Sequence, residues 1–347
     1  MKRSKWILLA TILIIVAAIS VTIALVPWAQ AAQVRISYQP SWHHVAFFIM
    51  AEKGWLQKVL GDRINVTLRE FPSGPPQMEA MVAGELDVVY VGAAPPLSVI
   101  AKGFKAKMVA VANTEGSSLV VRPDFRYEGP ASLIGRSVSV YPPGSIQDTL
   151  LKYWLLKNNI SIDKVRIINQ RGPAEQLESL RAGALDAILT PDPAPYIAVL
   201  EGYGKIAITS RHMWPQHPCC VVLMTEEFIR KHRDLAVKLI ALHIIASEYA
   251  MDPKNRDEVK QILIKWLGIR REVAEMFPGS TNLMSDPRNL NWLEGLDYMC
   301  EVHYQLGLTK TAEGRPVRLK AGDIVDSSLY EEALKIVPQI KAILGLG

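Results

Sequence analysis

Residues 74–87 read GPPQMEAMVAGELD, and residues 172–186 read GPAEQLESLRAGALD. Each stretch has a glycine–proline start, a helical pattern and an Ala-Gly-x-Leu-Asp ending. Each is followed by strand-like residues and a proline-rich corner, at residues 95–96 and 191–195 respectively. Self-similarity about a hundred residues apart indicates two copies of one supersecondary unit. The sequence therefore predicts two related α/β lobes.

Apolar strand-like runs alternate with helical patterns along most of the chain. This alternation predicts mostly parallel strands covered by helices. We expect strands at residues 34–39, 64–71, 87–92, 108–113, 137–141, 165–169, 187–190 and 206–209, and a further strand at 219–225. Long amphipathic helices follow and should pack back on the first lobe. The expected divisions are a leader (residues 1–31), lobe 1 (32–121), lobe 2 (122–216) and a return to lobe 1 with the C-terminal helices (217–347), with a ligand cleft at the hinge.

The composition excludes several classes of protein. Of 347 residues, 49% are apolar, which supports large cores and argues against a disordered chain. Lys and Arg number 39 against 34 Asp and Glu. Without Lys2, Arg3 and Lys5 of the leader the net charge falls to +2. No concentrated basic stripe or zinc-finger spacing occurs, so we do not expect nucleic acid as a partner.

The N-terminus has the order of a secretory signal. A basic segment at residues 1–5 precedes 21 uncharged residues, 6–26, and a small-x-small site at Ala29-Gln30-Ala31. The apolar run is also long enough to span a bilayer, so the alternative is an uncleaved N-terminal anchor. Either interpretation places the globular part outside the cytoplasm, in the periplasm or at the outer face of the cytoplasmic membrane.

Candidate ligand-binding residues lie in the turns after the predicted strands, because open α/β sheets bind ligands beyond the carboxyl ends of their strands. We expect Ser145 and Gln147 to hold one side of a ligand and Gln39, Trp42 and the Ala93–Ala94 backbone to hold the other. His43 and Asp192 would set charge specificity. The full set of candidates is Gln39, Trp42, His43, Ala93, Ala94, Gly144, Ser145, Gln147, Asp192 and His217.

The chain resembles the periplasmic solute-binding proteins of nitrate, sulfonate and taurine ABC importers, a family that also includes bicarbonate and thiamine-precursor binders. The resemblance lies in Ser37-Tyr38-Gln39, residues 51–56 (AEKGWL), residues 71–75 (FPSGP), residues 83–87 (AGELD), residues 90–96 (YVGAAPP), Pro143-Gly144-Ser145 and residues 220–223 (CVVL), and it extends to the helix with His243 and Glu248. It implies a bilobed type II periplasmic-binding-protein fold. It also implies a receptor that closes on one solute and delivers it to a permease with its ATPase, with no cofactor.

The resemblance leaves the solute open. Ala93–Ala94 replaces a polar residue that family members often have, which argues against nitrate itself. Asp192 would repel a bare anion. We therefore expect an oxyanion with a separate cationic or donor group, such as a sulfonate or taurine. A thiamine-pyrimidine-like aromatic solute is an alternative.

Two other classes remain as alternatives. The Gly144-Ser145-Ile146-Gln147 turn lacks the second glycine of a nucleophile elbow, so no enzyme is predicted. Metal capture would use His43, His44, His217, Asp192 or Cys219, but the adjacent histidines cannot readily share one ion. Cys219, Cys220 and Cys300 are odd in number, and their disulfide state stays open.

Overall fold

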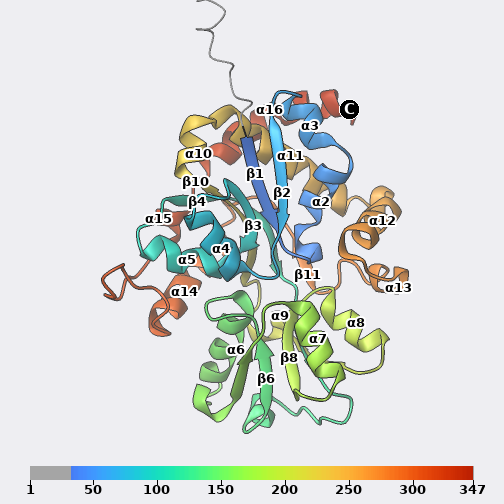
Figure 1. Cartoon of the computed structure of the whole chain (residues 1–347), viewed down its shortest axis with the longest axis vertical. Coiled ribbons are helices and arrows are strands. Elements are labelled where there is room, and N and C mark those ends of the chain that lie inside the picture. Colours follow the sequence, from blue (N-terminus) through green and yellow to red (C-terminus); the bar gives the residue numbers. More distant parts are fainter. Residues whose placement is uncertain (1–32, 347) are drawn as a thin grey trace, which may run out of the picture.

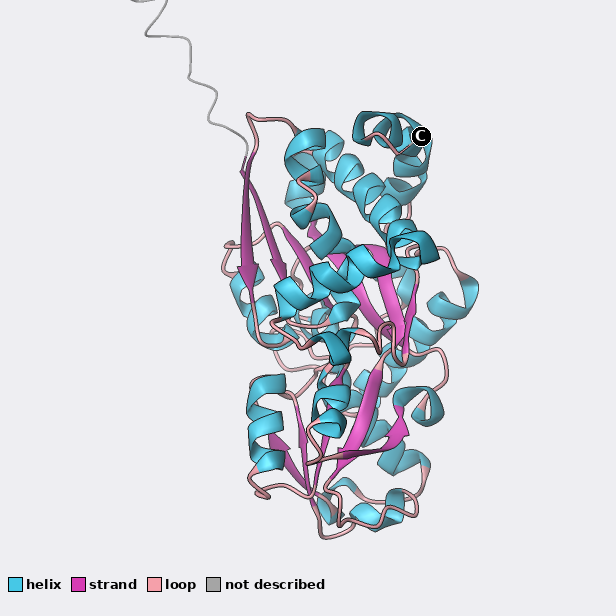
Figure 2. Ribbon diagram, turned by 90° about the vertical axis from the view of Figure 1, so that its right-hand side faces the viewer, coloured by secondary structure: helices cyan, strands magenta, loops and turns pink. Residues whose placement is uncertain are grey.

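The computed structural model describes residues 33–346, in which two mixed sheets form separate lobes (Figure 1). The predicted leader, residues 1–31, lies outside the described residues. Figure 2 shows the two sheets in separate halves of the molecule, each flanked by helices. The prediction of two α/β lobes is confirmed.

The sheet of the first lobe has the strand order β11-β4-β10-β3-β1-β2. Strands β2 and β3 lie parallel to β1, whereas β10 lies antiparallel between β3 and β4. The bounds are β1 (Gln33–Tyr38), β2 (Asn65–Glu70), β3 (Val88–Gly92), β4 (Ala106–Glu115), β10 (Pro218–Thr225) and β11 (Thr281–Leu283).

The sheet of the second lobe repeats this order as β7-β6-β8-β5-β9. Strands β7 and β8 lie parallel to β6, and β5 lies antiparallel between β8 and β9. The bounds are β5 (Ser117–Val121), β6 (Ser137–Val140), β7 (Arg166–Asn169), β8 (Ala187–Pro191) and β9 (Lys205–Thr209). In each lobe the antiparallel strand inside the sheet, β10 or β5, is the one that arrives from the other lobe, and β11 adds a further antiparallel strand at the edge of the first sheet. The two quoted repeats occupy equivalent places, as a helix leading into the third parallel strand.

Helices cover both sheets. The first lobe carries α2 (Val45–Glu52), α3 (Trp55–Leu60), α4 (Gly74–Val82), α5 (Ala94–Ala101), α10 (Glu226–Lys231), α11 (Arg233–Met251), α12 (Arg256–Leu267), α13 (Arg271–Ala274), α14 (Leu290–Gln305), α15 (Ala321–Ile324) and α16 (Ser328–Leu344). The second carries α6 (Ile146–Lys157), α7 (Pro173–Arg181), α8 (Ala194–Leu200) and α9 (Ser210–Met213). Short 3-10 turns are η1 (Trp42–His44), η2 (Pro130–Leu133), η3 (Ile162–Lys164) and η4 (Pro253–Asn255). Among residues 33–346, none of the helices is long and apolar enough to cross a bilayer.

The chain leaves the first sheet at Gly116, whereas the sequence placed the end of this part of lobe 1 at residue 121. The difference arises because β5, at residues 117–121, pairs with β8 and β9 of the second sheet. The return crossing lies between α9 and β10. Glu115 ties the two crossings together, since its Oε2 accepts from Arg211 Nε at 2.6 Å and its Oε1 from Gln216 N at 2.9 Å.

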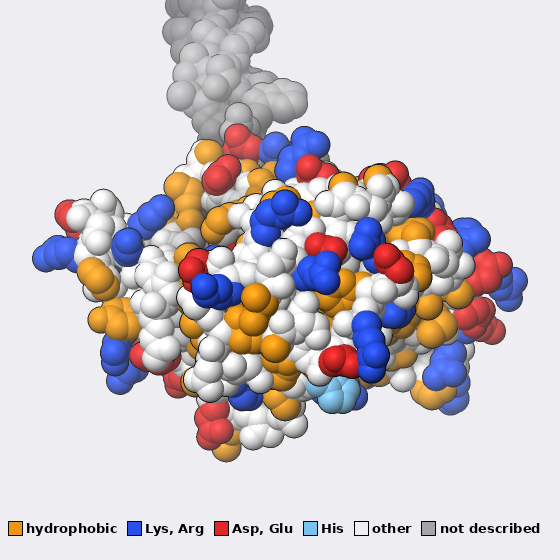
Figure 3. All heavy atoms as spheres, turned by 90° about the horizontal axis from the view of Figure 1, so that it is seen from below, with side chains coloured by type: hydrophobic (Ala, Val, Ile, Leu, Met, Phe, Trp, Pro, Cys, Tyr) orange, Lys and Arg blue, Asp and Glu red, His pale blue; other side chains and the backbone are white. Residues whose placement is uncertain are grey.

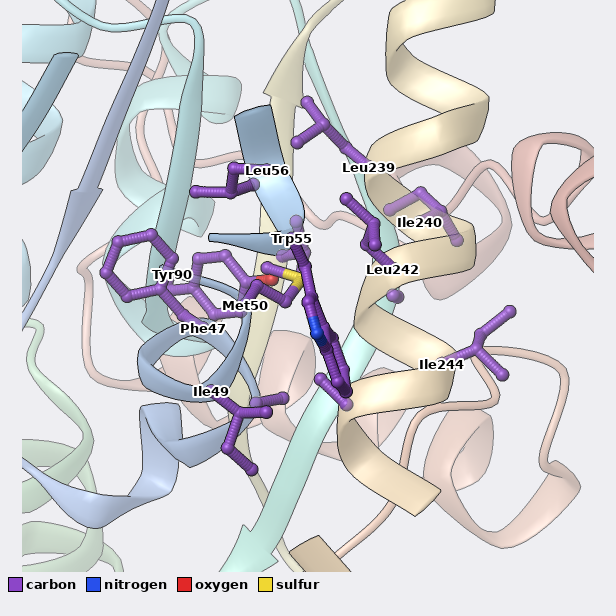
Figure 4. Close-up of a cluster of buried hydrophobic side chains, with 14 of the residues drawn as sticks. Phe47, Ile49, Met50, Trp55, Leu56, Tyr90, Leu239, Ile240, Leu242 and Ile244 are labelled. Carbon is purple, nitrogen blue, oxygen red and sulfur yellow. The ribbon is translucent and has the colours of Figure 1, made fainter. Parts of the chain in front are cut away.

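The main core of the first lobe fixes the segment that follows β1. Helices α2 and α3 pack against α11 and the side of β3, and their apolar side chains interdigitate (Figure 4). The buried members drawn there include Phe47, Ile49, Met50, Trp55, Leu56, Tyr90, Leu239, Ile240, Leu242 and Ile244. The expected packing of a long C-terminal helix on the first lobe is thus observed for α11. Because α2 begins directly after η1, this core also holds η1 at the edge that faces the second lobe.

Charged side chains are dispersed over the end of the molecule seen in Figure 3. Lys and Arg alternate there with Asp and Glu and with apolar groups, and no single-sign stripe stands out on that face. Such mixing is typical of a solvated surface.

Candidate functional site

A small cavity lies between the lobes at the carboxyl ends of their parallel strands. The centre of a water-sized sphere can occupy about 20 Å³ of it, and a single water needs about 10–15 Å³ by this measure. Its lining comes from the first lobe (Gln39, Ser41, His43, Gly74, Gly92, Pro95), the second lobe (Tyr141, Ser145, Ile146, Gln147, Pro191) and the crossing strand β10 (Cys219, Cys220). Both lobes therefore contribute to one site.

A larger surface hollow of about 790 Å³ lies elsewhere, beside Arg35, Asp87 and Lys105. Every residue that lines it belongs to the first lobe. Closure of the two lobes cannot enclose a ligand there. The interlobe cavity is the better candidate because its shape depends on both lobes.

Asp192 joins the lobes outside the cavity. Its Oδ2 accepts hydrogen bonds from Ser280 N (2.9 Å), Ser280 Oγ (3.0 Å) and Thr281 Oγ1 (3.1 Å). Its backbone carbonyl accepts from Ser41 Oγ at 2.6 Å. Burial raises the pKa of the carboxyl to about 6, against the opposing effect of His43. The sequence predicted a ligand contact here, whereas the structure shows an interlobe clamp.

Trp42 belongs to the same clamp and not to the cavity lining. The ring is fully buried, and its Nε1 donates to Thr281 Oγ1 at 3.0 Å. It packs on Tyr196 of the second lobe, with ring centroids 5.5 Å apart. An apolar contact of this kind stabilises the closed arrangement of the lobes.

The start of α6 presents Ser145 and Gln147 to the cavity. Ser145 caps the helix, since its Oγ accepts from Asp148 N at 3.2 Å. Gly144 does not line the cavity, and its N–H donates to Asp148 Oδ2 at 2.9 Å. The buried Asp148 carboxylate, paired with Lys152 at 2.7 Å, therefore already offsets the positive end of this helix.

The Ala93–Ala94 turn does not line the cavity either. Its neighbours Gly92 and Pro95 do. The Ala93 N–H donates to the carbonyl of Cys219 at 2.7 Å, so it is engaged in the sheet and not free for a ligand. The correction follows from β10, which extends alongside β3 as far as this turn.

His43 meets both adjacent cysteines at the cavity wall. Its Nε2 lies 2.9 Å from the Gly116 carbonyl, which can only accept, so Nε2 carries the proton. Its Nδ1 lies 3.5 Å from Cys219 Sγ and 3.7 Å from Cys220 Sγ. Burial opposes charge on both His43 and Cys219. The hydrogen bond with Cys220 and the attraction to His43 nevertheless lower the pKa of Cys219, and the attraction to Cys219 raises the pKa of His43.

Comparisons with known proteins show which family this chain belongs to and which solved structures have a similar fold. The model of the NMT1-like family matches residues 29–264, more than half of the chain. The chain belongs to the NMT1-like family. This NMT1-like protein is similar to the alkanesulfonate-binding protein SsuA from Xanthomonas axonopodis pv. citri bound to MOPS, with a TM-score of 0.73 and 20% identity over 86% of this chain and 99% of that one. It is also similar to the periplasmic nitrate-binding protein NrtA from Synechocystis, with a TM-score of 0.74 and 16% identity over 91% of each chain.

These likenesses show a periplasmic-binding-protein fold and confirm the family resemblance seen in the sequence. Both neighbours are binding proteins and not enzymes, as the sequence predicts for this chain. A curated relative, the bicarbonate transport ATP-binding protein CmpC of Synechocystis, is 24% identical over 251 residues, 67% of this chain and 37% of CmpC. The chain spans less than half the length of the curated relatives compared with it.

The cavity of this NMT1-like protein contains four of the ten candidates, namely Gln39, His43, Ser145 and Gln147. His217 is buried outside it, where its Nδ1 lies 3.0 Å from the Pro218 carbonyl. Ser41, Gly74, Tyr141, Cys219 and Cys220 line the cavity without having been selected. Tyr141 and Ser41 lie at or after the ends of predicted strands, so the argument used for the other turns could also have selected them. The cysteines lie within a strand, outside the reach of the turn argument, and the sequence named only Cys219, as a possible metal ligand.

Proposed function

We propose that this NMT1-like protein is the extracytoplasmic solute-binding component of an ABC importer. It captures a small oxyanion between its lobes and delivers it to a membrane permease with its ATPase. The observation that carries the proposal is the cavity whose lining both lobes supply. A solute that contacts both lobes binds the closed state better than the open one, which is the physical requirement for a transport receptor.

Several neutral donors line the cavity, among them Tyr141, Ser145 and Gln147. Tyr141 Oη is buried and has no hydrogen-bond partner within the described residues, although Tyr141 lines the cavity. A buried hydroxyl without a partner costs about 1–3 kcal/mol, so an acceptor oxygen there would relieve it. The first-turn N–H groups of Ile146 and Gln147 have no intrahelical acceptor and lie at the same wall. These groups suit the oxygen atoms of a small anion.

The structure removes the main reason to expect a cationic group on the solute. That expectation rested on Asp192 facing the ligand, and Asp192 binds Ser280 and Thr281 instead. No Asp or Glu lines the cavity among the residues that the structure describes. The small volume also favours an ion of few heavy atoms over an extended sulfonate. Nitrate, bicarbonate and short sulfonates are therefore the first solutes to test.

The likenesses support the transport role without defining the solute. SsuA is an alkanesulfonate-binding protein, NrtA a nitrate-binding protein and CmpC a bicarbonate transport protein. All three names describe the handling of small oxyanions. The ATP-binding description of CmpC supports an ATPase-driven partner.

Thermal unfolding against a panel of solutes tests the proposal. The panel contains nitrate, bicarbonate, methanesulfonate, taurine and a thiamine pyrimidine, each with a chelator present so that metal ions do not contribute. A solute at a hundred times its Kd adds about 2.7 kcal/mol to the unfolding free energy, which raises the midpoint by several degrees. We expect one or more small oxyanions to give this shift.

Variants of the α6 start locate the binding. Ser145→Ala and Gln147→Ala should abolish most of the shift, because both side chains line the cavity. Gln305→Ala, exposed on α14, is the control and should keep the full shift. A full shift in Ser145→Ala and Gln147→Ala, or a shift with the pyrimidine alone, would contradict the proposal.

A further inference from the structure

Cys219 and Cys220 point to the same side of β10 although they are neighbours. In a regular strand, adjacent side chains point to opposite faces. Here the pairing of β10 with β4 shifts register at Cys220, from Pro218↔Thr114 to Cys220↔Asn113 and then to Val221↔Val111. This irregularity re-aims one side chain, as β-bulges beside functional sites commonly do. Both sulfurs then lie against His43.

The distances among these three ligand atoms match a tetrahedral metal site. The two Sγ atoms are 3.8 Å apart, and Nδ1 lies 3.5 and 3.7 Å from them. A zinc ion with Zn–S bonds of about 2.3 Å and a Zn–N bond of about 2.0–2.1 Å, at tetrahedral angles, places its sulfurs about 3.8 Å apart and sulfur and nitrogen about 3.6 Å apart. The cluster therefore needs almost no rearrangement to hold such an ion.

The surroundings orient His43 for this role. Its Nε2–H donates to the Gly116 carbonyl, so the Nδ1 lone pair faces the sulfurs. Histidine ligands of metals usually have their second N–H held in this way. Gly116 permits the approach, because a Cβ there would lie 2.3 Å from His43 Nε2. These contacts with Gly116 thus fix the orientation of the His43 ring.

We propose that His43, Cys219 and Cys220 form a binding site for a thiophilic d¹⁰ metal ion such as Zn²⁺, with its fourth coordination position open to the interlobe cavity. Two sulfurs and one imidazole nitrogen select soft or borderline ions over Ca²⁺ and Mg²⁺, which require oxygen ligands. All three residues line the cavity, so the open position faces Ser145, Gln147 and Tyr141 of the second lobe. Three protein ligands with one open position is the arrangement of a site that binds a further ligand on the metal.

Charge at the cluster is compatible with metal binding. Cysteine binds metal as its thiolate. On binding, the metal replaces the protons of the two thiols, and these protons pass to solvent. The site lies in a cavity wall without Lys or Arg among the described residues, so no side-chain cation competes with the ion there.

This site does not depend on the importer role. The two proposals fail separately, because the oxyanion panel is measured with chelator and the metal experiment without added solute. Co²⁺ is the probe for the metal site, since its tetrahedral thiolate complexes absorb strongly in the near ultraviolet and show visible d–d bands. Zn²⁺ then displaces the coloured ion.

The experiment uses the reduced, metal-free protein, in which all three cysteines are first titrated as free thiols. One equivalent of Co²⁺ should give a thiolate charge-transfer band and tetrahedral d–d bands, and one equivalent of Zn²⁺ should remove them. Cys219→Ser, Cys220→Ser and His43→Gln should each weaken the Zn²⁺ affinity by more than about a hundredfold, the upper end for a group that merely orients a ligand. Cys300→Ser is the matched control, because Cys300 is also a buried free thiol but lies outside the cluster.

Three results would overturn the proposal. The first is the absence of the thiolate band in the reduced wild-type protein, a measurement that needs no variant to fold. The second is unchanged Zn²⁺ affinity in a folded Cys219→Ser or Cys220→Ser variant. The third is a Cys219–Cys220 disulfide that resists mild reduction, since the two sulfurs could not then bind a metal.

Discussion

Gln77 and Gln176 make the same contacts in the two lobes. Gln77 Nε2 on α4 donates to Ser37 Oγ on β1 (2.8 Å) and to the Tyr90 carbonyl on β3 (3.0 Å). Gln176 Nε2 on α7 donates to Ser139 Oγ on β6 (3.2 Å) and to the Leu189 carbonyl on β8 (3.3 Å). Each glutamine thus ties a helix to the first and third parallel strands of its lobe. The internal repeat of the sequence is therefore also a repeat of buried hydrogen bonds.

Replacing either glutamine by leucine should destabilise the protein. Both side chains are fully buried, and leucine leaves a strand carbonyl and a serine hydroxyl without their donor. We expect Gln77→Leu and Gln176→Leu each to lower the free energy of unfolding by about 1–3 kcal/mol, measured by urea denaturation. Gln305→Leu on exposed α14 is the control. A loss under half a kilocalorie, which is ordinary for surface changes, would show that these bonds contribute little.

Gly116→Ala should lower the free energy of unfolding through a steric clash as well as through backbone strain. Gly116 has φ +87° and lies where a Cβ would meet His43 Nε2 at 2.3 Å and Thr281 Oγ1 at 2.7 Å. Gly314 has a similar φ of +83° but open space around it. Gly314→Ala should therefore lower the unfolding free energy by about 1 kcal/mol, and Gly116→Ala by distinctly more. Equal losses in thermal unfolding would mean that the close approach to His43 is easily relieved.

Removing the Asp192 carboxylate should loosen the closure of the lobes. Asp192→Ala leaves the donors of Ser280 and Thr281 without their acceptor, and Asp192→Asn retains one carbonyl oxygen for them. We expect the alanine variant to lose about 1–3 kcal/mol of stability and to show a larger radius of gyration in small-angle scattering. The asparagine variant should lie closer to wild type. An unchanged radius in a folded Asp192→Ala protein would exclude the clamp.

Stability should fall as the pH drops from about 6.5 towards 4. Burial lowers the pKa of His243 and His303 from 6.5 to about 4 and that of His44 to about 3, so the folded state keeps them neutral while the unfolded state takes up protons. Each such histidine costs about 1.4 kcal/mol of stability per pH unit within that window. Asp192, with its pKa raised to about 6, opposes them between about 4 and 6, but as a single group.

His303→Gln tests this pH dependence. His303 is buried with its Nε2 2.8 Å from Thr149 Oγ1, and glutamine can replace that bond without titrating. The unfolding midpoint of the variant should decline less steeply between pH 6.5 and 4, because one buried histidine no longer contributes to the pH dependence. Exposed His212→Gln is the matched control. An identical decline in His303→Gln and wild type would show that this histidine is not kept neutral by burial.

Local patterns were sufficient for the architecture but only partly for the site. The quoted repeats and the alternation of strands and helices predicted two α/β lobes, because hydrophobic period and turn residues are properties of neighbouring positions. The turn argument found Gln39, His43, Ser145 and Gln147 for the same reason, as strand ends in such sheets converge. Trp42 and Asp192 also follow strands, but their partners lie in β11 and the turn before it, and nothing near them in sequence reveals those partners.

The sequence by itself determined the family and the two-lobed α/β fold, and it predicted the edge of each sheet at which a ligand would bind. Only the tertiary structure decided that Cys219 and Cys220 face His43. His43 precedes Cys219 by 176 residues in the sequence. A strand pattern places adjacent cysteines on opposite faces, and only the pairing of β10 with β4 introduces the irregularity that unites them. Register between distant strands depends on the whole sheet and on how the lobes close, so it cannot be encoded in the periodicity of either segment.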